Sequence, residues 1–301
     1  MLDYIKKPDG VLKKDNLEIP YFNSLEESNK DEKVIEDFGE EWLKFSSFSK
    51  EDLSIIGDAY FLLTEDLDRK NMNVLDIGCG TGRWAYYLSS KVKSIEAIDP
   101  SLAVYSAAKM LKDKQNVRVT RCELDAIPFT PGTFDLVYSL GVLHHIPDTN
   151  KAIEKAVSFV KPNGYFLVYL YYSVANRGFL FKSIFHITNV FRRVISILPS
   201  MLKKFVCDII ALLIYLPIVT IGRILLKLAP NSKLVKKIPL IVYSENKSSF
   251  QILRNDSLDR FGTQLEQRFT RQEIFDMLDK SGLKEIKFAE SGAKWVAIGK
   301  K

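Results

Sequence analysis

Between residues 73 and 172, short apolar runs alternate with segments whose apolar residues recur every three or four positions. The short runs are typical of buried strands and the periodic segments of amphipathic helices. Strands and helices that alternate at this spacing form a parallel sheet covered on both faces, which predicts a doubly wound α/β fold. The predicted strands are 73–77, 94–99, 116–122, 133–140 and 165–172, and the predicted helices are 83–90, 102–113 and 150–160, the last ended by "KPNG".

The alternation stops after residue 172 and resumes near residue 261. The intervening segment is rich in Phe, Ile, Leu and Lys, which predicts a helical insertion after the fifth strand. Beyond it, "TRQEIFDMLDKSG" predicts a helix with Thr270 as N-cap, Glu273 three residues later and Gly282 at its end. Two last strands follow, close enough to form a hairpin. The predicted parts are an N-terminal extension with lid helices (1–69), an α/β core (70–172), the insertion (173–260) and a C-terminal helix and hairpin that complete the core (261–301).

Charge is unevenly distributed along the 301 residues. The chain carries a formal net charge of +6, yet residues 177–254 contain thirteen Lys and Arg against two acids, Asp208 and Glu245. That segment therefore carries +11 and the remainder −5. A basic, apolar segment in a mildly acidic protein favours an anionic surface or substrate. A nucleic-acid partner is not expected, because the basic residues are interleaved with long aliphatic side chains rather than gathered in a polar groove.

The apolar stretch 209–222 contains no charged residue. At ~1.5 Å per residue it makes about 21 Å of helix, short of the ~30 Å core of a bilayer. Asp208 and Arg223 bound it and Pro217 is expected to kink it, so a full membrane span is not expected. Two alternatives remain: a buried lid helix, and a peripheral membrane contact through 179–240. Basic pairs on either side of the stretch favour anionic lipid as the partner of such a membrane contact. Both alternatives allow a lipid-like methyl acceptor. The pairs are 192–193, 203–204 and 236–237.

The three cysteines, Cys79, Cys122 and Cys207, are widely separated and form no CxxC pair. They are predicted to be free thiols in a reducing compartment, with no zinc site. The N-terminal twenty residues lack the apolar core of a signal peptide. A cytoplasmic location is therefore expected, with membrane association through residues 179–240 as the alternative.

The segment "VLDIGCGTGRW" (74–84) places three glycines directly after the first predicted strand, where ligands of open parallel sheets bind. A phosphate-binding P-loop needs Lys and Ser or Thr after its last glycine, whereas Arg83 and Trp84 follow here. The dinucleotide motif GxGxxG is also absent, because the spacing is GxGxG. Asp76 would repel a pyrophosphate and attract the cationic amino-acid end of a ligand.

Two further acids end the next strand regions. Asp99 can accept both hydroxyls of an unphosphorylated ribose. Asp125 can accept from an adenine amino group, a role that nearby Glu123 can also fill. Amino acid, ribose and adenine together are the parts of S-adenosylmethionine. The alternative for Asp76 is a cap on the following turn.

Four motifs, "VLDIGCGTGRW", "IEAIDPS", "LDAIPFTPGTFDLVYSLGVLHHIPD" and "KPNGYFLVYLYY", resemble those of the class I (seven-stranded) S-adenosylmethionine-dependent methyltransferases. The resemblance is good over residues 70–172 and fair over residues 265–300. With "FGEEW" before the core and "GVLHHIPD" after the fourth strand, it is greatest to the type 11 branch. The resemblance implies a Rossmann-like, mostly parallel seven-stranded sheet with an antiparallel last strand.

The resemblance also implies how S-adenosyl-L-methionine is bound. Asp76 would lie near its ammonium, Asp99 would hold the ribose hydroxyls, and Asp125 with the Ala126 amide would contact the adenine edge. The end of the fourth strand, at Leu140 and Gly141, would lie under the sulfonium. The implied cofactor-binding set is Asp76, Gly78, Cys79, Gly80, Gly82, Trp84, Asp99, Pro100, Asp125, Ala126 and Leu140, with Cys79 as a small filler rather than a nucleophile.

Methyl transfer from a sulfonium is an in-line displacement, and a hydroxyl acceptor also needs a base. His144 and His145 follow the fourth strand, and adjacent residues in a turn do not point the same way, so one of them at most meets substrate. The alternative is that one packs and hydrogen-bonds to backbone. Quinone-type relatives often have an acid in the first of these positions, as part of a base or metal contact. Because His144 stands there instead, no metal is predicted.

Substrate contacts are expected from the end of the fifth strand, at Tyr171 and Tyr172, and from Arg268, which can bind an anionic acceptor group or remain solvated. Phe38 and Trp42 are expected to form a lid or simply to pack. The predicted function is S-adenosylmethionine-dependent methyl transfer to a small-molecule, sugar or lipid-like acceptor. The alternatives are transfer of the adenosyl or aminocarboxypropyl group, and a non-catalytic nucleoside-binding protein.

Overall fold

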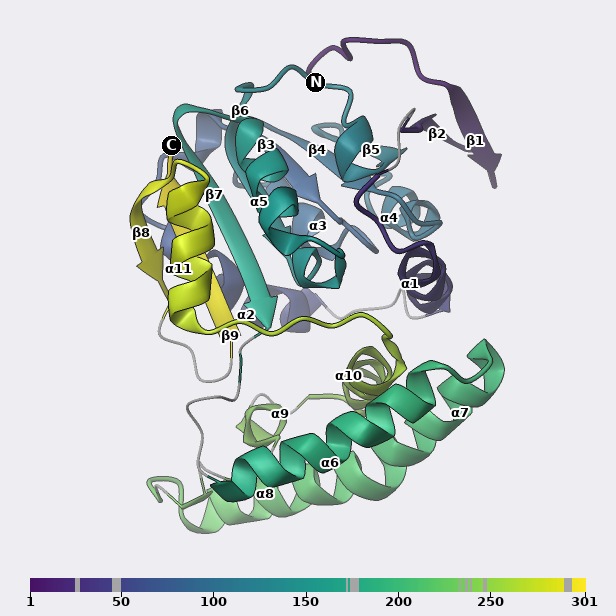
Figure 1. The fold of residues 1–301 in the computed structure, drawn as a ribbon, viewed down its shortest axis with the longest axis vertical. Helices are drawn as coiled ribbons and strands as arrows, with labels where there is room; N and C mark the ends of the chain where they lie inside the picture. Colours follow the sequence, from purple (N-terminus) through teal and green to yellow (C-terminus); the bar gives the residue numbers. More distant parts are fainter. Residues whose placement is uncertain are drawn as a thin grey trace. The chain divides into compact units, whose positions relative to one another are not determined.

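The computed structural model divides into two compact units, residues 1–176 with 265–301, and residues 177–264. Figure 1 labels the helices and strands of both units. The first unit contains the α/β core and the second is helical. The residues that the structure describes are 1–24, 28–44, 50–171, 173, 179–232, 234–235, 238, 240–245, 248–289 and 294–301.

The central sheet of the first unit has the strand order β1-β2-β5-β4-β3-β6-β7-β9-β8. Five consecutive strands, β5 to β7 in that order, are parallel, and β9 runs antiparallel to both β7 and β8. The predicted α/β class with an antiparallel last strand is therefore confirmed. The bounds are β3 Asn73–Ile77, β4 Ser94–Asp99, β5 Val117–Cys122, β6 Phe134–Leu140, β7 Val160–Tyr171, β8 Lys284–Phe288 and β9 Lys294–Lys300.

The predicted number of seven strands is wrong, because the sheet has nine. The two additional strands form an N-terminal hairpin, β1 Gly10–Lys14 and β2 Leu17–Phe22, and β2 extends the sheet parallel to β5. Asp15 and Asn16 join them, both with positive φ (48° and 64°), the backbone of a tight two-residue hairpin turn. The residues around these short strands are polar and rich in turn formers, so no strand is predicted here from the sequence.

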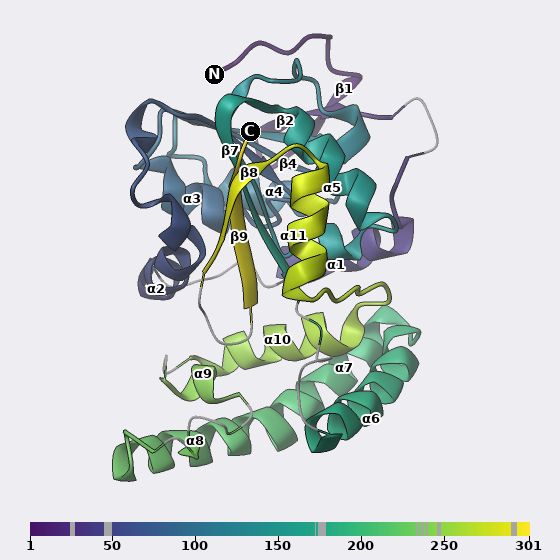
Figure 2. The same cartoon turned by 60° about the vertical axis from the view of Figure 1, so that its left-hand side comes forward.

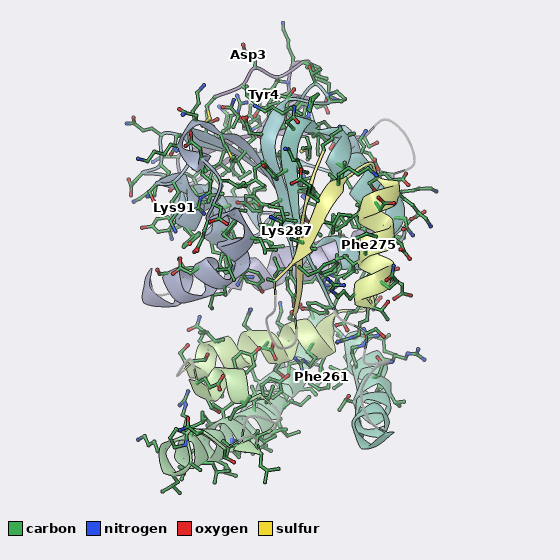
Figure 3. The ribbon with its side chains drawn as sticks, turned by 90° about the vertical axis from the view of Figure 1, so that its left-hand side faces the viewer. Asp3, Tyr4, Lys91, Phe261, Phe275 and Lys287 are labelled. Carbon is green, nitrogen blue, oxygen red and sulfur yellow. The ribbon has the colours of Figure 1, made fainter. Side chains whose placement is uncertain are left out.

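The segment before the hairpin also packs on this edge of the sheet. The Tyr4 ring lies 4.9 Å from Phe22 and 5.4 Å from Phe129, centroid to centroid, and its hydroxyl is 2.6 Å from Thr120 Oγ1. Figure 3 labels Tyr4 and its neighbour Asp3. Arg118 of β5 lies over the same ring and binds the buried Glu96 of β4. Glu96 accepts from the Leu2 amide at 3.2 Å, so aromatic packing and bonds to this ion pair fix the N-terminal residues to the sheet.

Helices cover both faces of the sheet (Figure 2). On one face, α5 and α11 bury Ile153 and Ile274 against Leu75 and Val137. On the other, α2, α3 and α4 pack in a second cluster that includes Leu88. The sheet is therefore doubly wound, as predicted. The bounds are α1 Glu32–Lys44, α2 Lys50–Phe61, α3 Arg83–Ser89, α4 Val104–Met110, α5 Thr149–Ser158 and α11 Arg271–Lys280.

The structure can be compared with two boundaries that the sequence predicts, the start of α11 and the segment "KPNG". The predicted capping box is confirmed, since Thr270 accepts from the Glu273 amide and the Glu273 side chain accepts from the Thr270 amide. The prediction that "KPNG" separates a helix from a strand is wrong, because β7 begins at Val160 and includes it. Asn163, with φ at 62°, donates its amide to the Lys301 carbonyl, so pairing with the chain end holds this segment in the sheet.

The second unit is helical, as predicted for the insertion. Its elements are α6 Phe179–Ser196, α7 Ser200–Ile210, a π-helical turn η6 Ala211–Tyr215, α8 Leu216–Leu228, α9 Ile241–Glu245 and α10 Phe250–Gly262. Side chains of this unit, with Phe261 of α10 labelled, are drawn in Figure 3.

One helix runs without interruption from Ser200 to Leu228, 29 residues. At ~1.5 Å per residue this helix measures about 43 Å, so it is longer than the charge-free stretch 209–222 from which no full span was expected. Pro217 does not end the helix, because the π-helical turn directly before Leu216 accommodates its missing amide and its ring. By length and composition the helix meets the requirement for a membrane span, which the core helices of soluble proteins also meet.

Candidate functional site

The glycine loop connects β3 to α3 at the carboxyl edge of the sheet. Gly78, Gly80 and Gly82 all have positive φ, 77°, 52° and 79°, a backbone that other residues adopt at a cost. The amides of Gly78 and Cys79 both donate to the Ile98 carbonyl at 2.9 Å. The loop is thus held against β4 by its backbone, and each glycine is required by the conformation.

Close approach is a second reason for two of these glycines. A Cβ on Gly78 would lie 2.4 Å from Val142 Cγ2, and one on Gly82 would lie 2.7 Å from Leu111 Cδ1. Val142 lies in the segment that joins β6 to His144 and His145. The glycine loop and the histidine segment are therefore in direct contact.

Asp76, on β3 immediately before the loop, is 1% exposed. Its Oδ2 has no hydrogen-bond partner among the described residues. Burial raises the pKa of Asp76 to about 8, with Tyr138 and Arg83 acting against the shift and the Asp99 charge adding to it. A buried carboxylate oxygen that lacks a partner is stabilised by a cation. Asp76 thus fits the ammonium of a bound amino-acid group.

Asp99 ends β4 and contacts the same loop. Its Oδ2 accepts from the Gly80 amide at 2.9 Å, and its Oδ1 accepts from the amide and hydroxyl of Ser101 at 2.8 and 2.6 Å. Burial raises the pKa of Asp99, while the bonds from Ser101 and Gly80 favour its charged form. Because a carboxylate has about four acceptor positions, room remains for a hydroxyl donor. The structure therefore brings the predicted ribose acid to the glycine loop.

The predicted adenine contacts lie on a short 3-10 turn, Leu124–Ala126. Asp125 is exposed and accepts a 3.2 Å bond from the Asn29 amide. The Ala126 amide donates to the Glu123 carbonyl at 3.0 Å, so this donor is already used here. Glu123, the alternative to Asp125, pairs with Lys30 at 2.8 Å. Asp125 is thus the more accessible of the two acids.

Asn29 was not predicted from the sequence. Its side chain donates to the Asp148 carbonyl at 2.7 Å and accepts from the Asp148 amide at 2.9 Å, while its own amide reaches Asp125. It thereby ties the N-terminal segment to the adenine-side turn and to the start of α5. These partners lie more than 90 residues away in sequence, so no local pattern marks them.

The remaining predicted cofactor residues are placed around the loop. Trp84 is buried with its ring 5.0 Å from that of Tyr60, and the Pro100 carbonyl accepts from Arg121 Nε at 2.9 Å. Leu140 is the last residue of β6. Burial raises the pKa of the Cys79 thiol well above its usual range, which keeps the thiol neutral and suits a small filler.

His145 lies in a 3-10 turn directly after β6, and its ring is fixed by one hydrogen bond. His145 Nδ1 is 2.7 Å from the Leu265 carbonyl oxygen. A carbonyl only accepts, so Nδ1 carries the hydrogen and Nε2 presents a lone pair. That Nε2 is buried and has no partner among the described residues. The arrangement leaves a proton acceptor in a defined orientation.

His144 differs from its neighbour. It is fully buried, and neither ring nitrogen has a partner among the described residues. Its ring packs 4.0 Å from that of Tyr171 and 4.1 Å from that of His145. Burial, the neighbouring His145 and Arg268 hold the pKa of His144 well below its usual range. His144 is therefore neutral and acts as a packing ring.

His145 belongs to an aromatic cluster, defined here as Phe38, His144, His145, Tyr169 and Tyr171. Phe38 lies 5.0 Å from His145, and Tyr169 lies 5.7 Å from Tyr171, centroid to centroid. Phe38, predicted to form a lid or to pack, and Tyr171, predicted to contact substrate, thus both lie against the histidines. Tyr172 and the Trp42 side chain, predicted for the same two roles, lie outside the described parts of the chain.

Arg268 is not simply solvated. Its guanidinium lies 5.4 Å from the Tyr171 ring centroid and its Nε donates to Glu266 at 2.7 Å. The side chain of Glu266 is 2% exposed, so this ion pair is largely inside the protein. Within the described ranges, no three His, Cys, Asp or Glu side chains gather closely enough to hold a metal ion.

Residues 75–168 match the family described as "Methyltransferase domain". This segment is a methyltransferase domain of the type 11 branch. It contains the glycine loop, all three predicted acids and both histidines of the "GVLHHIPD" segment, so the resemblance seen in the sequence is confirmed.

Among similar curated proteins is a ubiquinone biosynthesis O-methyltransferase of Coxiella burnetii, 25% identical over 119 residues, which are 39% of this chain and 49% of that protein. One of the same name from Bradyrhizobium diazoefficiens is 32% identical over 98 residues, 32% of this chain and 39% of that protein. The chain therefore spans less than half the length of these relatives. A SAM-dependent methyltransferase of Thermotoga maritima has a TM-score of 0.46 and 16% identity, over 87% of this chain and 94% of that one.

The buried Asp76 predicts how ligand binding by this methyltransferase domain depends on pH. We expect S-adenosylhomocysteine, which carries an ammonium, to bind more tightly at pH 7.5 than at pH 6, because more of the Asp76 carboxyl is then ionised. Asp76→Asn should bind at least about tenfold more weakly at pH 7.5 and lose this pH dependence. Titration calorimetry measures both. Equal affinity of the two proteins would contradict the assignment.

The same substitution should stabilise the protein without ligand. The folded-state pKa of Asp76 is raised above the unfolded value of 3.8, so the folded state holds the proton more tightly. The free energy of unfolding therefore falls as the pH rises from about 4 to about 8. Asn cannot ionise, so Asp76→Asn should have a higher Tm than wild type at pH 8 and a similar Tm at pH 4, by thermal melts.

Proposed function

We propose that this protein is an S-adenosylmethionine-dependent O-methyltransferase that acts on a hydroxyl of a small aromatic molecule. The observation that carries the proposal is His145, whose Nε2 lone pair is buried, unpartnered among the described residues, and aimed by the bond from Nδ1 to the Leu265 carbonyl. Histidine fixed in this way is suited to take a proton from a hydroxyl. The names of the curated relatives, which are O-methyltransferases, support the same reaction.

The residues around the glycine loop support S-adenosylmethionine as the cosubstrate. Asp76 offers a buried carboxylate for the ammonium, Asp99 offers acceptor positions for the ribose, and Gly78 lets the loop lie directly against Val142 of the histidine segment. When bound, S-adenosylmethionine supplies an activated methyl group.

The protein's own residues have to position the acceptor and remove the proton of its hydroxyl. In the proposal, the aromatic cluster holds the acceptor ring, His145 Nε2 accepts the hydroxyl proton, and the Leu265 carbonyl stabilises the resulting imidazolium through Nδ1–H. Holding two reactants in line replaces an encounter in solution, which contributes several kcal/mol to the barrier reduction.

The aromatic cluster supports an aromatic acceptor. Phe38, Tyr169 and Tyr171 are half-buried rings next to the histidines. Flat rings pack against such side chains by offset or edge contacts. Because Arg268 is paired with Glu266, the proposal does not include an anionic group on the acceptor.

A product assay tests the proposed function. Methyl-labelled S-adenosylmethionine is incubated with the protein and a panel of phenols and catechols, and products are separated by chromatography. We expect S-adenosylhomocysteine together with a labelled methyl ether. Formation of methylthioadenosine or free methionine would instead support transfer of another group. Binding of S-adenosylhomocysteine with no turnover of any phenol or catechol would contradict the proposal.

A further inference from the structure

The helix Ser200–Leu228 has one face packed within its own unit. Cys207, Ala211 and Val219 on this face are fully buried. Ser257 of α10 donates to the Cys207 carbonyl at 2.8 Å, and Ser244 of α9 donates to the Val219 carbonyl at 3.0 Å. The orientation of the helix about its axis is therefore fixed by packing and by hydrogen bonds.

The opposite face of the same helix exposes large apolar side chains along its whole length. Met201 is 86% exposed, Leu213 66% and Leu228 76%. Monomeric soluble proteins rarely expose a contiguous apolar surface of this extent without a function. We define the apolar face as Val190, Phe191 and Val194 of α6, Ile197 directly after it, and Met201, Leu202, Phe205, Ile209, Leu212, Leu213, Ile214, Ile221, Ile224 and Leu228 of the long helix.

The charges of the second unit show what kind of surface this face fits. Asp208, one of only two acids in residues 177–254, is neutralised by Arg254, which donates to it at 2.7 and 2.6 Å. Exposed cations border the apolar face, with Arg193 next to Val194 and Lys227 next to Leu228. Apolar side chains bordered by cations suit the boundary between lipid headgroups and acyl chains of an anionic bilayer.

We propose that the apolar face docks on an anionic lipid bilayer, with the long helix lying in the plane of the surface. This orientation keeps the Asp208–Arg254 pair and the bonds from Ser257 and Ser244, all of which belong to the packed face. A spanning helix would have to break these contacts inside hydrocarbon. A second copy of the chain is disfavoured as the occupant, because two segments of +11 repel each other.

Labelling at Met201 tests the docking. The three native cysteines are buried, so a thiol-reactive NBD dye reacts selectively at Met201→Cys in the full chain. We expect its emission to rise and shift to the blue on adding vesicles of phosphatidylcholine with 30% phosphatidylglycerol, and much less with pure phosphatidylcholine. The matched control is Leu62→Cys, an exposed apolar position of the first unit, whose dye should not respond.

Flotation with the same vesicles gives the second readout. Phe205→Ser with Leu213→Ser, both exposed, should weaken partitioning by roughly tenfold or more, while Leu62→Ser should leave it unchanged. Binding of wild type should fall as salt is raised and be lost in alkaline carbonate. Each of three results would overturn the proposal: no flotation, carbonate-resistant insertion, or a wild-type dimer that Phe205→Ser converts to a monomer. The docking does not depend on methyl transfer, so either proposal can fail alone.

Discussion

His145→Gln is expected to lower kcat for O-methylation by about 10²–10⁴-fold while leaving the affinity for S-adenosylhomocysteine within twofold. The physical reason is that the Nε2 lone pair of His145 is the oriented proton acceptor of the aromatic cluster, and Gln has no basic nitrogen. Single-turnover kinetics with a phenol or catechol that the wild-type protein methylates measure the chemical step.

His144→Phe is the matched control for this experiment. His144 is buried and neutral and packs 4.0 Å from Tyr171, so a phenyl ring keeps its packing and removes both nitrogens. We expect kcat to change less than about tenfold, since no hydrogen bond to described residues is lost. If His144→Phe loses more activity than His145→Gln, the roles of the two histidines are reversed and the assignment is wrong.

The sheet, the glycine loop and the place of the three acids were predictable, because their signals are local. Each strand of the core is a short apolar run, and Asp76 and Asp99 follow from where their strands end. The structure adds that Asp99 holds the Gly80 amide, which explains why the acid and the loop belong together. Sequence periodicity and turn chemistry were sufficient here, since neighbouring residues decide both.

The features that escaped prediction depend on contacts distant in sequence. His145 is oriented by Leu265, 120 positions away, and Asn29 meets Asp125 and Asp148 from the N-terminal segment. The sequence could name two candidate histidines but could not choose between them, because the choice rests on that single carbonyl. The length of the long helix was missed for another reason: Asp208 and Arg223 bound the charge-free stretch 209–222, but the helix continues past both of them.

Gly78→Ala is expected to weaken binding of S-adenosylhomocysteine by at least about 100-fold, and with it kcat/KM for the methyl acceptor. Two costs combine. A Cβ at this position would lie 2.4 Å from Val142 Cγ2, and the φ of 77° is unfavourable for any L residue by roughly 1–2 kcal/mol. Because the Gly78 amide is bonded to the Ile98 carbonyl, the loop cannot move away without losing that contact.

Gly132→Ala separates these two costs. Gly132 has a similar φ of 73°, yet a Cβ there would meet nothing within 4 Å, so this variant carries the backbone strain alone. We expect it to lower stability by about 1 kcal/mol and to leave ligand affinity within twofold. Adding Val142→Ala to Gly78→Ala should recover part of the lost affinity, because it removes the atoms that the new Cβ meets. Calorimetry on the four proteins measures this, and if Gly78→Ala binds as tightly as Gly132→Ala, close contact between the loop and the β6 segment is not what shapes the cofactor site.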